Sequence, residues 1–364
     1  MFTSTTALTR ERWRRCAHIV RISAALGAIY GTVFGLASAV TGWHALLTSM
    51  LIGVISGTLI GSSSAVDIFI LRQGRLPWFD ALPLALVIAL RTLIYGGVAA
   101  AVAAGQPGER LLGVAAAFNA RSALITIGFS LAVTAVLIIV FQAAVLVGYR
   151  TFLALLLGKY RQPHAEQRYF LFVDVVGSTA IAERLGPYQA HRFLASVFST
   201  VAEPIALCRG EIYQYVGDEI VVTWSQADGT VDARPVRCVF EMRAALLARS
   251  TQFLARFGVV PHLRAALHEG EVIAGEVGEM RRAIVFHGDV MNTTGRLEQA
   301  TREIDCHFIA SANAIDALGS PRGWQAHDLG ELRLRGRVEP IRAFCVSRHD
   351  EAPEPSPPRQ GGGG

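Results

Sequence analysis

Lysine and cysteine are both scarce in this sequence. Lys159 is the only lysine, and the five cysteines form no C-x-x-C pair and no cluster with histidine. They are Cys16, Cys208, Cys238, Cys306 and Cys345. Their scatter argues against a zinc site and against a disulfide framework, so we expect reduced thiols. The net charge of +5 is therefore almost wholly arginine, and arginines at membrane edges explain it better than a nucleic-acid surface does.

Charged residues are missing from a long stretch near the N-terminus. Ile22–Val66 has no Asp, Glu, Lys or Arg, and Gly42-Trp43-His44 divides it near the middle. Each half exceeds the ~20 residues that span a bilayer, so the stretch predicts a helical hairpin. Ala81–Gly105 and Ser122–Tyr149 predict two more spans. Residues 1–149 are thus expected to form an all-α bundle of four membrane helices, in contact with the lipid bilayer.

Basic residues gather on one side of these predicted spans. They precede the first span, separate the second from the third and follow the fourth, at Arg10, Arg12, Arg14, Arg15, Arg72, Arg75, Arg150, Lys159, Arg161 and Arg168. The positive-inside rule then puts both termini in the cytoplasm, at the cell (inner) membrane. Arg91 lies inside the third span, and Asp67 closes the second. These two charges either pair to fix helix packing or mark a functional site in the membrane.

Three segments follow the predicted membrane domain. Residues 150–168 form a juxtamembrane linker, in which Thr151–Leu157 could extend the fourth helix until a glycine and a proline break it. This linker is either a plain tether or an element that transmits motion. Residues 169–348 form a second, cytoplasmic domain. The Pro- and Gly-rich residues 349–364 are expected to be disordered.

The second domain has the mixture of strands and helices that is typical of an α+β protein. Helices against a mostly antiparallel sheet predict a ferredoxin-like fold. The expected strands are Tyr169–Asp174, Glu211–Val216, Ile220–Trp224, His262–His268, Glu271–Val277, Ala283–Phe286, His307–Ala310, Gln325–Arg335 and Ile341–Val346. The expected helices are Thr179–Leu185, Tyr188–Arg209, Thr230–Phe257, Asp289–Ala300 and Ala312–Leu318.

Two aspartates stand out in this domain. Asp174 ends the apolar run Phe170–Val173 ahead of a turn that opens a helix, and Asp218 lies at the tip of a predicted β-hairpin. Hard carboxylate oxygens suit Mg²⁺ or Mn²⁺, and the N–H groups of a strand–turn–helix suit a phosphate. The pair therefore predicts a site for a nucleoside triphosphate with two metal ions. An aspartate at a strand end can also be a simple helix cap.

Three separated motifs connect these residues to a known family. F-V-D-V-V-G-S-T, Y-V-G-D-E-I and G-D-V-M-N-T-T-G-R, in this order, resemble the catalytic domain of class III adenylate/guanylate cyclases of the membrane-anchored bacterial type. The resemblance covers Tyr169 to about Val346. It implies an enzyme in which the ribose 3′-hydroxyl of ATP or GTP attacks the α-phosphate and pyrophosphate leaves. It also implies two metal ions and a site shared across a head-to-tail homodimer.

The resemblance assigns the metal and phosphate sites to particular residues. Asp174 and Asp218 match the family's two metal-binding aspartates, and Val175 matches a residue whose carbonyl also binds metal. The turn that meets the β- and γ-phosphates is matched by Val176, Gly177, Ser178 and Thr179. Ordinary turn and capping chemistry would equally favour the glycine and the two hydroxyl residues.

The resemblance also implies a set of residues for the transition state. Asn292 and Arg296 lie four apart on a predicted helix and match a pair that orients the ribose and holds the α-phosphate. Arg335 matches a lysine that grips the terminal phosphates, which arginine can do bidentately. A solvated polar face is the alternative for the helical pair, and it is the stronger alternative for Arg335 because Arg333 and Arg337 lie on either side.

Two positions depart from the family pattern. The residue that reads the base, usually lysine, is Gln214, and its partner, usually Asp or Thr, is Val285. Gln214 can still donate to and accept from a base edge, whereas Val285 offers no side-chain hydrogen bond. We expect ATP as substrate and 3′,5′-cyclic AMP as product, because the broad bacterial-type group of this family mostly makes cyclic AMP. Guanine and pyrimidine bases stay open.

Two alternatives compete with an active class III cyclase. V-G-D-E-I is similar to the G-G-D-E-F signature of diguanylate cyclases, but the Asp174–Thr179 turn and the downstream N-x-x-x-R favour class III. The second alternative is a degenerate module that binds a nucleotide and signals through its dimer without turnover. The retained aspartates with Asn292 and Arg296 favour the enzyme, and the lost base readers favour the module.

Overall fold

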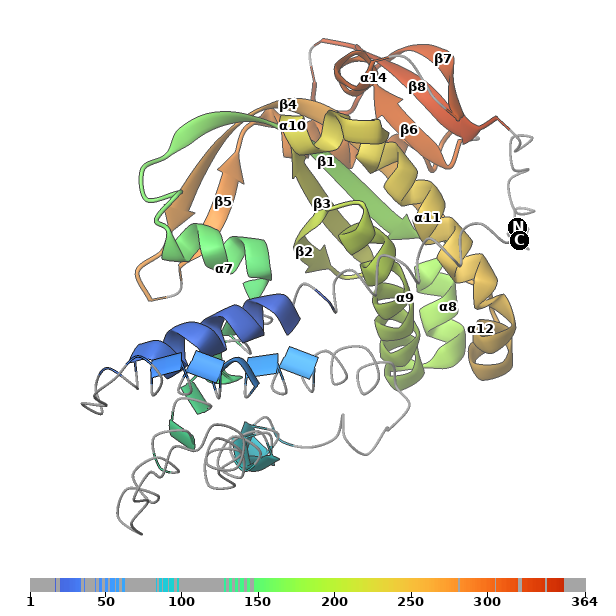
Figure 1. Cartoon of the computed structure of the whole chain (residues 1–364). Helices are drawn as coiled ribbons and strands as arrows, with labels where there is room; N and C mark the ends of the chain where they lie inside the picture. The colour runs from blue at the N-terminus through green and yellow to red at the C-terminus, as the bar shows by residue number, and fades with distance from the viewer. Residues whose placement is uncertain are drawn as a thin grey trace. The chain divides into compact units, whose positions relative to one another are not determined.

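The computed structural model describes residues 148–349 except 281, 305, 320–322 and 338, together with residue 17, residues 20–33 and short groups of residues between 36 and 147. The chain divides into two compact units, Met1–Val147 and Gly148–Gly364 (Figure 1). The predicted tail, residues 350–364, lies outside the described residues.

Glycines bring two helical segments of the first unit together. Residues 20–33 are helical, as are the described residues between 50 and 62. A Cβ added to Gly27 would lie 2.1 Å from the carbonyl oxygen of Gly53, and one added to Gly57 would lie 2.2 Å from that of Ser23. The two backbones therefore approach more closely than any larger residue would permit.

Much of the first unit lies outside the described residues. Among those that the structure does describe, no helix has both the length and the apolar content that a bilayer crossing requires. Trp43, expected between the first two helices, is itself helical. Arg91 and Asp67 are outside the described residues, so their pairing stays a prediction.

The second unit is an α+β domain built on one eight-stranded sheet. Its first four strands run in the order β2-β3-β1-β4, with antiparallel neighbours. This is the split β-α-β-β-α-β arrangement of a ferredoxin-like fold, as predicted. The four strands are β1 (His164–Val175), β2 (Glu211–Val216), β3 (Glu219–Ser225) and β4 (Leu263–Val277).

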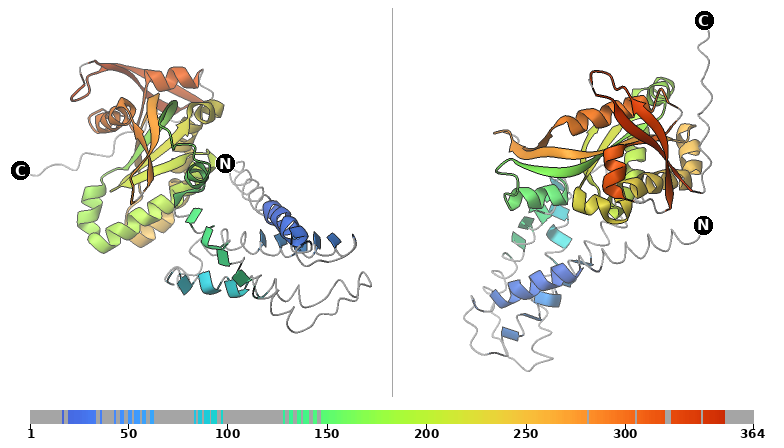
Figure 2. Two further views of the ribbon diagram at one scale, coloured as in Figure 1. Left: turned by 90° about the vertical axis from the view of Figure 1, so that its left-hand side faces the viewer. Right: turned by 90° about the horizontal axis from the view of Figure 1, so that it is seen from above.

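Four more strands extend the sheet from β4. The first half of β4 pairs in parallel with β6, which is followed by β8 and β7, and its second half pairs with β5. They are β5 (Ala283–His287), β6 (Phe308–Ser311), β7 (Trp324–Leu332) and β8 (Ile341–Arg348). The parallel β4–β6 pair makes the sheet mixed. Figures 1 and 2 show β6, β7 and β8 in orange to red at one end of the domain.

Helices pack on the sheet, and α8, α9, α11 and α12 lie together on one side of it in Figure 1. The helices are α8 (Ser178–Leu185), α9 (Pro187–Leu207), α10 (Gln226–Thr230), the 3₁₀ helix η2 (Val231–Ala233), α11 (Arg234–Ala248), α12 (Ser250–Phe257), α13 (Asp289–Ala300) and α14 (Ala312–Leu318). The expected bounds of α13 and α14 are confirmed, and those of α8 and α9 differ by one or two residues.

From Arg168 to Val175 strand β1 is buried on both faces, and this decides where its last residues point. Tyr169 and Val173 belong to the large core cluster shared with α9 and α11. Phe170 and Phe172 belong to a second cluster that includes Val290 of α13. Because side chains alternate along a strand, Asp174 continues the row of Phe170 and Phe172. The strand thus presents Asp174 on the face where α13 packs.

The long helix expected over Thr230–Phe257 is wrong. The segment divides into η2, α11 and α12, after the short helix α10. Asp232 and Ala233 have positive φ values of 52° and 44°, which a continuing right-handed helix excludes. Pro235 lies in the first turn of α11, where its missing N–H costs nothing. This local turn overrides the helical periodicity of the sequence.

The pair of strands expected at His262–His268 and Glu271–Val277 is also wrong, because β4 is continuous. Glu269 and Gly270 stay in register with Tyr169 and Arg168 of β1. A glycine at position 270 favours a break in the strand, but the pairing of Gly270 with Arg168 of β1 keeps β4 continuous.

The stretch expected to be a linker is folded into the second unit. Helix α7 (Tyr149–Leu156) begins after Gly148, whose φ of 95° ends any helix arriving from before it. Arg150 of α7 donates to Glu211 at 3.1 Å and Asp228 at 3.3 Å. Tyr160 is buried, and its carbonyl accepts from the N–H of Glu276. The chain is thus held from residue 148 onward, and β1 starts five residues before the expected strand.

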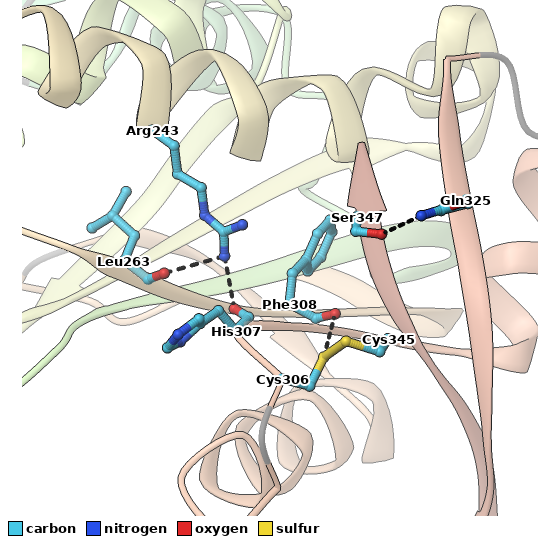
Figure 3. Close-up of a disulfide and its surroundings, with 8 residues drawn as sticks. All are labelled: Arg243, Leu263, Cys306, His307, Phe308, Gln325, Cys345 and Ser347. Carbon is cyan, nitrogen blue, oxygen red and sulfur yellow. Dashed lines mark hydrogen bonds between the residues drawn. A yellow bond between two sulfur atoms is a disulfide. The ribbon is translucent and has the colours of Figure 1, made fainter. Parts of the chain in front are cut away.

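A disulfide corrects the expectation that all cysteines are reduced. Cys306 and Cys345 are bonded across 39 residues of sequence, as Figure 3 shows. The antiparallel register of β6 with β8 places Cys345 opposite Ile309 and close to Cys306. Sequence spacing carries no sign of that register. Cys208 and Cys238 are free and buried, as expected for thiols, and Cys16 lies outside the described residues.

Candidate active site

The two predicted metal aspartates come together. Asp174 is the penultimate residue of β1, and Asp218 lies in the two-residue turn between β2 and β3, where Gly217 has a φ of 62°. Because β1 pairs with β3 up to Val173 and Ile220, the strand end and the hairpin tip are neighbours. A hydrogen bond joins the two carboxyl groups. The structure therefore forms the carboxylate pair expected from the sequence.

The two carboxyl groups have opposite pKa shifts. Burial raises the pKa of Asp174 to about 8, reinforced by its hydrogen bond to Asp218 and by the nearby negative charges, with Arg302 opposing. Burial acts against ionisation of Asp218 too, but hydrogen bonds from Asp174 and Ser178 hold its pKa below the usual range. Asp174 is thus the carboxyl of the pair that favours its protonated form, and a cation bound to the pair would favour the ionised form instead.

Three charged residues that sequence reasoning missed surround this pair. Arg302 donates to Asp174 Oδ2 at 3.1 Å and to Glu298 Oε1 at 3.3 Å. The pKa of Glu219 is raised to about 7 by burial and by the charges of Glu298 and Asp218. Glu298 and Arg302 are four residues apart, a spacing that predicts a helical ion pair. The sequence contains that spacing, but nothing in it indicates that the fold places Arg302 in contact with Asp174.

The residues after Asp174 form the expected turn. Val175 ends β1 opposite Leu263, and the N–H of Val176 donates to the carbonyl of His262. Gly177 has a φ of 68° and precedes α8, which starts at Ser178. The N–H groups in the first turn of a helix have no partner within the helix. Ser178 and Thr179 can therefore offer donors to an anion, whereas the N–H of Val176 is engaged by the fold.

Helix α13 carries Asn292 and Arg296 one turn apart, as predicted. Asn292 is exposed and Arg296 is half-buried. The Nη2 of Arg296 lies 3.6 Å from where a Cβ on Gly336 would be, so it lies beside the turn that holds Arg335. Within residues 148–349 as described, no hydrogen bond or ion pair joins Asn292 or Arg296 to the aspartate pair. One chain therefore holds two separate parts of the predicted site.

The structure distinguishes Arg335 from its neighbour Arg337. The strand expected to reach Arg335 ends at Leu332, so Arg335 lies in a turn and is exposed. Arg337 instead donates to Asp289 and to Thr293 in the first turns of α13. Arg337 holds the turn against α13, and Arg335 stays accessible to an anion.

The two departures from the family pattern lie on β2 and β5. Gln214 is exposed, and Val285 is half-buried opposite Gly275. The ring centroids of their neighbours Tyr213 and Phe286 are 5.2 Å apart. This contact brings β2 and β5 close to one another, so a base near Gln214 would also lie near β5.

The residues of the pair suit the expected divalent ions. Asp174 and Asp218 offer hard oxygens side by side, and the guanidinium of Arg302 already contacts one of them. Across the described part of the chain, no group of three or more His, Cys, Asp or Glu side chains forms a metal cluster. Two carboxylates with a backbone carbonyl, as the resemblance implies, would not form such a group.

Comparisons with known proteins agree with this geometry. The chain is 37% identical over 219 residues to adenylate cyclase 2 of Rhizobium meliloti (strain 1021), a match that covers 60% of each protein. It is 27% identical over 208 residues to guanylate cyclase 2G of Mus musculus, covering 56% of this chain and 18% of that one. The chain thus spans 60% or less of the length of these relatives.

A solved structure of a bacterial light-regulated adenylyl cyclase has the same fold. It is 17% identical, with a TM-score of 0.50, and the match covers 59% of this chain and 64% of that one. The model of the family described as "Adenylate and Guanylate cyclase catalytic domain" matches residues 161–347, which is just over half of the 364 residues. The expectation of a class III cyclase domain is confirmed, and the chain belongs to the adenylate and guanylate cyclase catalytic domain family.

Proposed function

We propose that this protein is a membrane-bound nucleotidyl cyclase, a lyase that converts ATP to 3′,5′-cyclic AMP and pyrophosphate for intracellular signalling. The observation that carries the proposal is the Asp174–Asp218 pair, in which the end of β1 and the β2–β3 turn bring two carboxyls together beside the first turn of α8. A paired carboxylate site next to free helix N–H groups suits a metal-bound triphosphate.

The chain's own residues would divide the work of the reaction. Asp174, Asp218 and the carbonyl of Val175 would hold two Mg²⁺ or Mn²⁺ ions, which supply charge neutralisation and an acidified ribose hydroxyl. The N–H groups at Ser178 and Thr179 would hold the terminal phosphates together with the guanidinium of Arg335, which is exposed in its turn.

Transition-state binding would come from α13. Arg296 would stabilise the charge that builds on the α-phosphate while the 3′-oxygen bond forms and the bond to pyrophosphate breaks. Asn292, one turn earlier on the same face, would orient the ribose. Neither side chain contacts the aspartate pair of its own chain among the described residues. A homodimer that brings α13 of one protomer to the aspartates of the other would complete the site.

ATP is the proposed substrate, with GTP as the alternative. The relative at 37% identity is an adenylate cyclase, and a guanylate cyclase is among the more distant ones. Gln214 can pair with either purine, because its amide both donates and accepts. Val285 can only contribute shape.

Membrane attachment through residues 1–149 is part of the same proposal. The uncharged stretch Ile22–Val66 and the arginines at the edges of the apolar segments support it. The close backbone approach at Gly27, Gly53 and Gly57 is of the kind that small residues permit between membrane helices. Both termini and the cyclase domain would then lie in the cytoplasm, at the cell (inner) membrane.

A catalytically degenerate nucleotide-binding module is the second candidate. The replacement of both usual base readers, by Gln214 and Val285, favours it. Such a module would bind a nucleotide and change its dimer without releasing pyrophosphate.

Turnover by the purified full chain separates the two candidates. The chain is supplied with ATP, GTP, CTP or UTP and Mn²⁺, and cyclic nucleotide and pyrophosphate are quantified. We expect equal amounts of cyclic AMP and pyrophosphate from ATP, and a loss greater than ~10² in rate for Asp174→Asn and Asp218→Asn. Arg342→Gln, in an exposed ion pair with Asp328, is the matched surface control. Nucleotide binding without any cyclic product would leave only the module.

A further inference from the structure

Arg302 lies directly on the carboxylate that the proposed function assigns to metal. Its Nη2 donates to Asp174 Oδ2 at 3.1 Å, and its Nε donates to Glu298 Oε1 at 3.3 Å. One guanidinium thus joins a β1 carboxylate to an α13 carboxylate. The bridge fills the position that a cation bound to Asp174 would have to share.

The anchoring of Arg302 allows its side chain to leave Asp174 without unfolding. Helix α13 ends at Ala300, and the N–H of Arg302 donates to the carbonyl of Gln299 in the following turn. A cation at a helix C-terminus is favoured by the helix dipole. Its side chain is 54% exposed, whereas those of Asp174 and Glu298 are 6% and 4% exposed. The arginine is the exposed member of a bridge whose two acids are buried.

The positive charge of Arg302 is important because its ion-pair partners are both acidic. Asp174 and Glu298 are both buried, and Arg302 is the cation in ion-pair contact with these two carboxylates among the described residues. A divalent ion and a guanidinium attract the same oxygens and repel each other. Binding of the ion therefore requires the guanidinium to move away or to weaken its bond.

We propose that Arg302 is a tethered counter-ion that competes with the divalent metal for Asp174 and sets its affinity. This inference rests on the proposed function of the aspartate pair. Arg302 offsets part of the negative charge around Asp174 and raises the metal concentration that the chain needs. It is a positioning residue, because it acts through Asp174 rather than on the nucleotide.

The test measures metal binding rather than turnover. Free Mn²⁺ is titrated against the purified full chain without nucleotide, and the unbound ion is followed by electron paramagnetic resonance. We expect Arg302→Gln to bind Mn²⁺ roughly tenfold more tightly, because one opposing charge at contact distance is removed. Arg302→Lys keeps the charge but loses the fork, so it should show a smaller gain. Arg342→Gln should match the wild type.

The outcomes separate this inference from the proposed function. If Asp174→Asn loses Mn²⁺ binding while Arg302→Gln and Arg302→Lys bind no more tightly than the wild type, the counter-ion role is wrong and the metal site stands. If Asp174→Asn binds Mn²⁺ as the wild type does, the metal assignment fails and the inference fails with it. Melting temperatures verify folding, and Arg302→Lys decides the question should Arg302→Gln not fold.

Discussion

At the scale of single residues, His268 is a buried histidine that the fold keeps neutral. Its Nδ1 lies 2.7 Å from Ser311 Oγ. Burial lowers the pKa of His268 to about 4, helped by the charge of Arg337, while Asp289 acts the other way. The unfolded chain therefore binds a proton near pH 6.5 that the folded chain refuses until about pH 4.

His268 should make the domain less stable as pH falls. Between pH 7 and pH 5 protonation of this histidine stabilises the unfolded state relative to the folded state. The free energy of unfolding should therefore drop by about 2 kcal/mol from this residue. Urea unfolding of the full chain at both pH values measures the drop. His268→Gln, which can still bond Ser311 but does not titrate, should lose about that much of the pH dependence. An identical pH slope in the variant would contradict the assignment.

Base choice is the second test at this scale. If Gln214 and Val285 lie against the base, Gln214→Lys with Val285→Asp should shift the ATP-to-GTP activity ratio toward ATP by tenfold or more. A gained hydrogen bond of this kind contributes on the order of 1–3 kcal/mol. Rates with both nucleotides measure the ratio. Gln325→Lys, which lies on β7, is the control for an added lysine. An unchanged ratio in the double variant would remove both positions from the base site.

At the scale of elements, the disulfide ties Cys306, which lies just before β6, to β8. It should appear in the peptide map of the oxidised, unreduced protein as a Cys306–Cys345 pair. A closed loop of this length stabilises by about 3–4 kcal/mol in the chain-entropy model. Cys345→Ser should lower the free energy of unfolding by that amount in oxidising buffer. After full reduction, wild type and variant should differ little, and a difference that survives reduction would point to packing instead.

The elements show how far the sequence determines the fold. The hairpin that bears Asp218 and the helix that bears Arg296 were predictable, because turn residues and periodicity are local. The break at Asp232 and Ala233 was missed, since positive φ at non-glycine residues leaves no compositional mark. Arg302 and the cysteine pair were missed because their partners are 128 and 39 residues away. Such contacts follow from strand order, which periodicity does not reveal.

At the scale of the whole molecule, the divided site predicts complementation between inactive chains. Asp174→Asn removes the metal part, and Arg296→Ala removes the transition-state part, so each protein alone should be nearly inactive. Mixed and allowed to exchange, half of the dimers would carry one intact site, which sets a ceiling of about a quarter of wild-type activity. Mixing Asp174→Asn with Asp218→Asn is the control, since both lesions fall in the same part. If protomers exchange between dimers and the activity still does not recover, a site shared between protomers is ruled out.

The way in which α7 is attached also decides where the domain can be cut. Tyr160 is buried in the same cluster as Phe170 and Phe286, and Arg150 bonds the base of the hairpin at Glu211. A fragment that starts at Tyr169 would expose that cluster and shorten β1, whereas one that starts at Gly148 keeps every contact of α7 with the sheet. Proteolysis should therefore release a stable product whose N-terminus is near residue 148. The practical boundary of the catalytic domain is the glycine before α7.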